Sequence, residues 1–119
     1  MPTQREWLTQ HIANQYGTEP EYLWTKHPDY AVYRHSSNRK WFAIIMRVSG
    51  SQISLSDVDE LDIINVKLPP EWITQLSGQH GFAPAYHMNK KHWLSVRLDN
   101  TLPENQILDL LKTSFAQTQ

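Results

Sequence analysis

The chain has 119 residues, the length of a single domain, and its hydrophobic fraction of 39% is enough to build a core, so wholesale disorder is excluded. The absence of cysteine excludes disulfides, thiolate zinc sites, iron–sulfur clusters and cysteine nucleophiles. The net charge of −1 argues against a protein that coats nucleic acid over its whole surface.

The N-terminal segment is predicted to form a helix over residues 2–16. Thr3 and Glu6 make a capping box, and apolar residues recur at the spacing of one helical face: Leu8, Ile12 and Tyr16. Gly17 then suits the position after the helix, where left-handed backbone is favoured. Residues 18–29 carry two prolines and are predicted to form a connecting loop.

A β-hairpin is predicted next. Residues 30–35 (YAVYRH) and 40–48 (KWFAIIMRV) are β-branched and aromatic runs separated by the turn sequence SSNR. A turn at SGSQ leads into a short third strand at 53–55 (ISL), and residues 61–68 (LDIINVKL) are predicted to form another strand.

The second half is predicted to add two helices and a strand. Pro70 suits the first position of a short helix that Gly78 closes. Residues 92–99 (HWLSVRLD) alternate as a strand with one apolar face. Pro103 opens a helix over 103–116 with an apolar stripe of Ile107, Leu108, Leu111 and Phe115.

These elements indicate the α+β class in one domain over residues 1–119. The tight turns of the first half favour an antiparallel β-sheet, and the N- and C-terminal helices are expected to pack on one of its faces. No apolar run approaches the roughly 18 residues of a membrane span. The first residues are too polar for a signal peptide, so we expect a soluble, cytoplasmic protein without a membrane partner.

Charge is distributed unevenly along the chain. Residues 30–56 contain no acidic side chain but include Arg34, Arg39, Lys40 and Arg47, and residues 72–98 likewise contain Lys90, Lys91 and Arg97. The acidic residues between them gather at 57–62, which is predicted to be a solvated loop. The folded domain could therefore have one positive and one negative face.

Residues 84–93, PAYHMNKKHW, combine histidine, lysine and asparagine with aromatic side chains. His87 and His92 are five residues apart across a predicted turn, not at the four-residue spacing that puts two metal ligands on one helical face, so we predict no metal site. The chain has no glycine-rich phosphate loop and no nucleophile elbow, and we expect neither catalysis nor a cofactor. A small-molecule pocket near Tyr86 and Trp93 stays open.

Two interpretations of this stretch remain. In the structural one, Asn89 favours a turn, His87 donates a ring N–H to a backbone carbonyl, and Trp93 covers the sheet edge. In the functional one, the turns around 34–40 and 87–92 project side by side. They would then form a cationic face near Trp41 and Trp93, from the side chains Arg34, Arg39, Lys40, Lys90, Lys91 and His92.

The stretch and the residues after it, LSVRLDNTLPENQILDLLKTSF, resemble the closing half of the MmcQ/YjbR family. The matching positions are Pro84, Tyr86, His87, Met88, Asn89, Lys90, His92, Trp93, Leu98, Asp99, Leu102, Pro103 and Ser114. Upstream, RHSSNRKWFAIIM resembles the family's hairpin and NVKLPPE its Val-Lys segment. The resemblance covers roughly residues 22 to 116. It implies a frataxin-like (CyaY-like) sandwich and DNA binding by paired basic wings.

We therefore expect a non-catalytic nucleic-acid-binding protein whose contacts with DNA are weak, salt-sensitive and carry little sequence preference. The alternative is a small-ligand or protein-interaction module in which the motif containing Tyr86, His87, Asn89 and Trp93 is structural. The sequence leaves the oligomeric state open.

Overall fold

The computed structural model describes residues 2–119. In it, helix α1 (Gln4–Tyr16) has the capping residues at both ends that the sequence predicts. The Thr3 hydroxyl accepts a hydrogen bond from the Glu6 amide, and the Glu6 carboxylate accepts one from the Thr3 amide, both at 3.1 Å. Gly17 has a φ of 61°, and its N–H donates to the carbonyl oxygen of Ala13. The capping box and the glycine therefore set both limits of α1.

Five strands form one antiparallel sheet in the order β1-β2-β3-β5-β4. Their bounds are β1 (Ala31–Arg34), β2 (Trp41–Ser49), β3 (Glu60–Lys67), β4 (Phe82–Pro84) and β5 (Trp93–Arg97). The predicted α+β class and antiparallel sheet are confirmed. Because β2 and β5 both run opposite to β3, their first residues lie at the end of the sheet where β3 finishes.

One strand prediction was wrong, and one strand was not predicted. Residues 53–55 do not form a strand: the chain forms the short 3₁₀ helix η1 (Gly50–Ile53), and Ser54 closes it with a φ of 64°. A segment of three residues is too short to show the alternation that identifies a strand. The turn at η1 is also tightly packed: a Cβ on Gly50 would lie 2.3 Å from the carbonyl oxygen of Val58. Strand β4 has only three residues and was not predicted.

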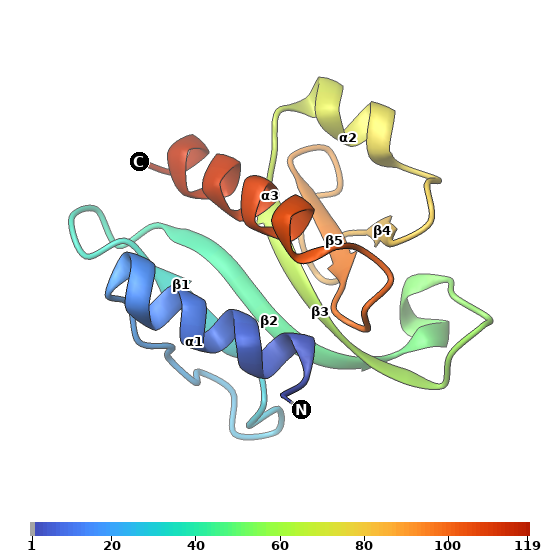
Figure 1. Ribbon diagram of the computed structural model, residues 1–119, viewed down its shortest axis with the longest axis horizontal. Helices are drawn as coiled ribbons and strands as arrows, with labels where there is room; N and C mark the ends of the chain where they lie inside the picture. The colour runs from blue at the N-terminus through green and yellow to red at the C-terminus, as the bar shows by residue number, and fades with distance from the viewer. Residues whose placement is uncertain (1) are drawn as a thin grey trace.

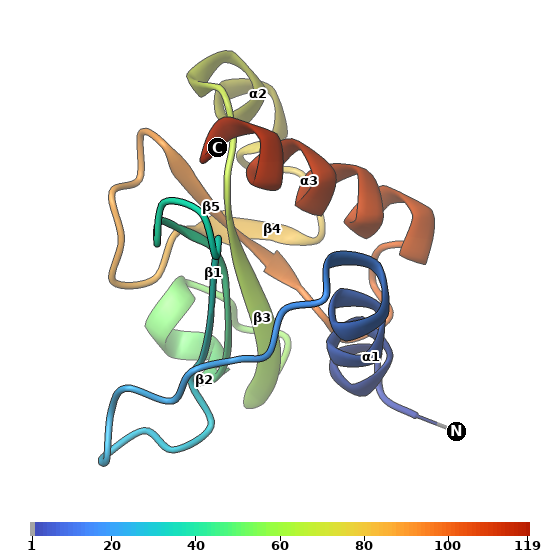
Figure 2. The same cartoon turned by 90° about the vertical axis from the view of Figure 1, so that its left-hand side faces the viewer.

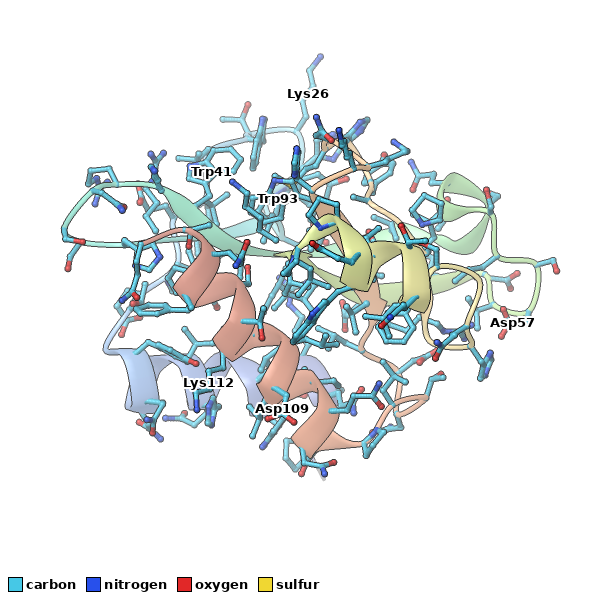
Figure 3. All side chains as sticks on the ribbon, turned by 90° about the horizontal axis from the view of Figure 1, so that it is seen from above. Lys26, Trp41, Asp57, Trp93, Asp109 and Lys112 are labelled. Atoms are coloured by element: carbon cyan, nitrogen blue, oxygen red, sulfur yellow. The ribbon has the colours of Figure 1, made fainter. Side chains whose placement is uncertain are left out.

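Three α-helices cover one face of the sheet (Figures 1 and 3). These are α1, α2 (Pro70–Leu76) and α3 (Glu104–Gln117). The core between α1, α3 and the sheet includes Leu8, Ile12, Phe42, Ile107 and Leu111. On α3, Leu110 is buried, whereas the predicted core residues Leu108 and Phe115 are only partly buried.

The opposite face of the sheet, the loop face, carries no α-helix within residues 2–119. Figure 2 shows η1 and the loops 17–30 and 85–92 on this side, across the sheet from α1 and α3. A second apolar cluster lies beneath them and includes Tyr30, Val32, Ile44, Met46 and Ile63. None of the helices within residues 2–119 has the length and apolar character needed to cross a membrane.

Candidate functional site

A buried hydrogen-bond network fixes the loop 85–92 on the loop face. Asn65 of β3 is fully buried, and its side-chain amide donates to the backbone carbonyl of Tyr86 at 3.0 Å. Ser95 of β5 donates its hydroxyl to the Asn65 side-chain oxygen and accepts from the Tyr86 amide at 3.1 Å. Since buried polar groups are costly unless paired, this network holds the loop at one place on the sheet.

The turn within this loop is built around Asn89. Its side-chain oxygen accepts from the Lys91 amide at 2.8 Å, and its carbonyl accepts from the Trp93 amide at 2.9 Å. His87 takes the left-handed conformation, with a φ of 59°, and is exposed. Its ring packs against Tyr86 with 3.9 Å between centroids and makes no hydrogen bond within residues 2–119, so the predicted bond to a carbonyl is not formed.

A row of three side chains, Trp41, Lys67 and Trp93, lies across the end of the loop face; we call it the end row. Lys67 is paired with Trp93 in the ladder and shares a face with Asn65, two residues earlier. Trp41 packs against the cluster of the loop face. Figure 3 shows both Trp41 and Trp93 on the side of the sheet opposite α3, and their strands β2 and β5 flank β3 in the sheet. Both indoles are half-buried, which leaves part of each ring in contact with solvent.

The hairpin turn that precedes Trp41 is attached to the C-terminus of the chain. His35 lies 2.6 Å from Thr118, measured from its Nε2 atom to the hydroxyl oxygen, and Asn38 donates to the Thr118 carbonyl at 3.0 Å. Figures 1 and 3 place the tip of this turn well away from the loop 85–92. The structure therefore brings together the ends of β2 and β5 but does not bring the two predicted turns side by side.

Ion pairs divide the basic residues into two classes. Every ion pair within residues 2–119 uses an arginine, and none uses a lysine. Arg34 and Arg39 both bind the carboxylate of Glu21, at 2.9 and 3.3 Å. Of the predicted binding residues, the exposed Lys40, Lys90 and Lys91 therefore remain available for an external anion. His92 is half-buried, and its carbonyl accepts from the Leu68 amide.

An aromatic pocket of about 270 Å³ lies between the loops 17–30 and 85–92. Trp24, Tyr30, Trp41 and Tyr86 form its walls, and it is also lined by His27, Ile44, Met46, His87 and Met88. The Trp24 and Trp41 rings are nearly perpendicular, at 86°, with 6.0 Å between centroids. Burial, followed by the neighbouring Tyr86, raises the pKa of Tyr30 to about 12, so its hydroxyl keeps its proton at neutral pH.

Most of this pocket was not predicted, because residues 18–29 were interpreted only as a connecting loop. The loop is anchored to the sheet edge by two backbone hydrogen bonds between Glu21 and Val32, at 2.8 and 2.9 Å. Its exposed apolar side chains, Tyr22, Leu23 and Trp24, were the available signal, since large apolar groups rarely cluster in a loop without a packing or binding role. Lys26, exposed in the same loop, was missed with them.

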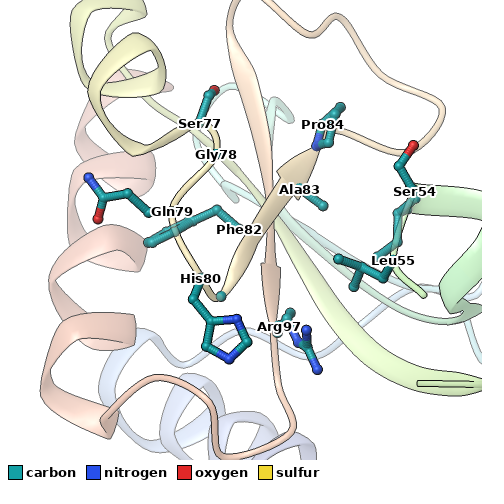
Figure 4. Close-up of a pocket in the computed structure, with 12 residues that line it drawn as sticks. Ser54, Leu55, Ser77, Gly78, Gln79, His80, Phe82, Ala83, Pro84 and Arg97 are labelled. Carbon is teal, nitrogen blue, oxygen red and sulfur yellow. The ribbon is translucent and has the colours of Figure 1, made fainter. Parts of the chain in front are cut away.

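A second cavity, of about 410 Å³, lies beside β4 (Figure 4). Arg97 and His80 lie at one end of it and Pro84 at the other. The Arg97 side chain is only 4% exposed, and its guanidinium binds Asp99 at 2.6 Å and Asp57 at 3.0 Å. The bond to Asp99 raises the pKa of Arg97 above its ordinary value. Because two carboxylates bind one guanidinium, the net charge at this end of the cavity is negative and repels a further anion. Arg97 therefore serves the ion pairs with Asp57 and Asp99 and is not assigned to ligand binding.

Within residues 2–119, no group of three or more histidine, aspartate or glutamate side chains is arranged to hold a metal ion.

Stability should depend on pH through His35. Burial lowers the pKa of this histidine from its usual value of 6.5, so between the two pKa values the folded protein binds fewer protons than the unfolded chain. The contribution of neutral His35 to the folding stability is therefore complete above about pH 6.5 and is lost as the pH falls through the folded-state pKa. Urea unfolding at about pH 7.5 and pH 5.5 should show a smaller pH effect in His35→Gln than in the parent. Equal pH effects in both proteins would contradict this assignment.

Comparison with known proteins gives consistent results. The model of the family described as YjbR matches residues 13–117. The chain is 43% identical to the Bacillus subtilis protein YyaQ, over 97% of this chain and 98% of that one, and 32% identical to Escherichia coli YjbR, over 69% and 71%. A crystal structure of a Pseudomonas syringae protein superposes with a TM-score of 0.93 at 38% identity, over 97% of this chain and 98% of that one.

Proposed function

This chain belongs to the YjbR family, and from that premise we propose that it binds nucleic acid through the loop face of its sheet without catalysing a reaction on it. The family resemblance implies DNA as the partner. It also implies a frataxin-like sandwich, which is compatible with three α-helices on one face of an antiparallel sheet.

The observation that carries the proposal is the end row. Lys67 stands between two half-buried indoles, and the exposed Lys40 immediately precedes Trp41. Phosphates are bound by lysine, and bases stack on aromatic side chains, so this alternation suits a strand whose backbone and bases both approach the sheet. Lys90 and Lys91 extend the positive charge along the loop that leads to Trp93.

The ion pairs change the predicted binding set. Arg34 and Arg39 share Glu21 and would have to give up part of that pairing to contact phosphate. We therefore assign the main phosphate contacts to Lys40, Lys67, Lys90 and Lys91, and a smaller share to the two arginines and His92. Contacts of this kind carry little sequence information, so binding should be weak, salt-sensitive and similar on different sequences.

Replacing Lys90 and Lys91 by alanine should weaken oligonucleotide binding on all sequences. Each phosphate contact removed should flatten the slope of log affinity against log salt by about 0.9 on duplex or about 0.7 on single strands. Arg39→Ala/Lys40→Ala should flatten it less, because Arg39 already binds Glu21. Fluorescence anisotropy over a salt series measures both quantities.

Lys112→Ala is the matched control, since this exposed lysine lies on α3, on the other side of the molecule (Figure 3). Its affinity and salt slope should equal those of the parent. A parent that does not bind at low salt, or a Lys90→Ala/Lys91→Ala variant that binds as the parent does, would refute nucleic-acid binding by this face. All variants should keep the parent's stability to within about 0.5 kcal/mol, since the positions are exposed.

The aromatic pocket favours a second function, the binding of a small planar ligand, with the motif around Asn89 serving as its scaffold. In that case a free heterocycle would quench tryptophan fluorescence while oligonucleotides would not bind.

A further inference from the structure

The aromatic pocket lies on the loop face, between loops that carry Lys26, Lys90 and Lys91. An aromatic pocket bordered by loops that carry lysines suits a flat group attached to an anion. We propose that the pocket receives one unpaired nucleobase of a bound strand, so that the protein prefers single-stranded or locally unpaired nucleic acid to intact duplex. This inference rests on the proposed function and deepens it by naming the substrate class.

The lining of the pocket selects an uncharged, flat group. The indoles of Trp24 and Trp41 are nearly perpendicular, and the ring centroids of Trp24 and Tyr30 are 5.9 Å apart. Within residues 2–119, no lysine, arginine, aspartate or glutamate lines the pocket. Flat aromatic groups gain from offset and edge-to-face packing against such walls. At about 270 Å³ the pocket is slightly smaller than the roughly 300–1,000 Å³ of pockets for drug-sized ligands, which suits one ring system.

The charges around the pocket select what the flat group is attached to. Lys26 belongs to the loop 17–30 and Lys90 to the loop 85–92, the two loops that border the pocket, and the Arg34 guanidinium lies 5.6 Å from the centre of the Trp41 ring. An aromatic cage for a quaternary ammonium would be disfavoured by the two lysines, whereas Arg34 already binds the carboxylate of Glu21. A neutral ring fits the uncharged aromatic lining, and an anionic backbone attached to it fits the lysines of the bordering loops. A nucleotide combines these two groups.

Polar groups at the rim can meet the edge of a base. His27 stacks on Tyr30 with 4.4 Å between centroids, and His87 is exposed at the other side of the opening. The Tyr86 hydroxyl accepts from Gln52 at 2.9 Å, which fixes this wall of the pocket. Imidazole nitrogens and phenol oxygens can donate or accept, so they would tolerate different bases.

A base inside a duplex cannot enter this pocket. It is stacked and paired, and taking it out of the helix costs a few kcal/mol. A single strand has little of that cost, and stacking of a base on an aromatic side chain is sequence-tolerant. The preference for unpaired nucleic acid follows from the pocket, while the dependence on salt follows from the lysines.

Trp24→Ala is the decisive variant, because the Trp24 side chain is 37% exposed and its removal should leave the fold intact. Affinity for a single-stranded oligonucleotide should fall about tenfold, the scale of one stacked base, and the salt slope should not change because no phosphate contact is lost. Trp24→Phe should keep most of the affinity. Trp72→Ala, which removes an indole of 42% exposure from α2, is the matched control and should bind as the parent does.

The parent should bind the single strand more tightly than the duplex at equal salt, and a strand with abasic sites throughout should bind the parent and Trp24→Ala equally. If Trp24→Ala binds the single strand as the parent does while Lys90→Ala/Lys91→Ala binds less tightly, the pocket inference is overturned and the proposed function stands. If the parent binds no oligonucleotide at low salt, the proposed function fails. Thermal unfolding of each variant identifies any loss of binding caused by misfolding, and Trp24→Phe then decides the question.

Discussion

Leu111→Ala is expected to lower the free energy of unfolding by about 2–5 kcal/mol, the range of fully buried leucine truncations. Leu111 is completely buried in the cluster that α1 and α3 share with the sheet, so truncation removes apolar contacts and leaves a cavity there. Urea unfolding followed by circular dichroism measures the change.

Lys112→Ala is the control for this prediction because it lies next along α3 and is exposed. It should change stability by no more than about 0.5 kcal/mol. If Leu111→Ala were as stable as the parent, the packing of α3 on the sheet would be incorrect.

Asn65→Ala is expected to cost about 1–3 kcal/mol, because it leaves the Ser95 hydroxyl and the Tyr86 carbonyl without their partner in a buried place. The loss should be concentrated in the loop 85–92, which the network fixes to β3 and β5. Amide hydrogen exchange at Tyr86 should therefore accelerate more than exchange in α1.

Oligonucleotide affinity should fall in the same variant, since the loop carries Lys90 and Lys91 and one wall of the aromatic pocket. Asn105→Ala, at an exposed position in the first turn of α3, should leave both exchange and affinity unchanged. Unchanged exchange at Tyr86 in Asn65→Ala would show that the network does not hold the loop.

Local signals in the sequence were sufficient for much of the fold. The capping box at Thr3 and Glu6 and the glycine at position 17 define α1 by contacts within a few residues, and Pro70 marks the first turn of α2 in the same way. The alternation of residues 93–97 likewise predicts β5. The errors fall where a segment is too short to show a period, as at Ile53 and in β4.

The site was less accessible to sequence reasoning because its decisive contacts join distant residues. Glu21 pairs with Arg34 and Arg39, and Asp57 pairs with Arg97, so counting charges along the chain overestimated the free arginines. The aromatic pocket requires Trp24 and Trp41 to meet across a loop and a strand, which no local pattern encodes. The turn around Asn89, by contrast, is made by neighbouring residues.

The five indole N–H signals of a ¹⁵N-labelled sample provide the most direct test of the loop face as the binding surface. Trp24, Trp41 and Trp93 lie on the loop face or in its loops, whereas Trp7 and Trp72 lie on α1 and α2. Titration with a single-stranded oligonucleotide at low salt should shift the signals of Trp24, Trp41 and Trp93 and leave those of Trp7 and Trp72 in place. Shifts confined to Trp7 and Trp72, or binding that moves none of the five, would contradict the account.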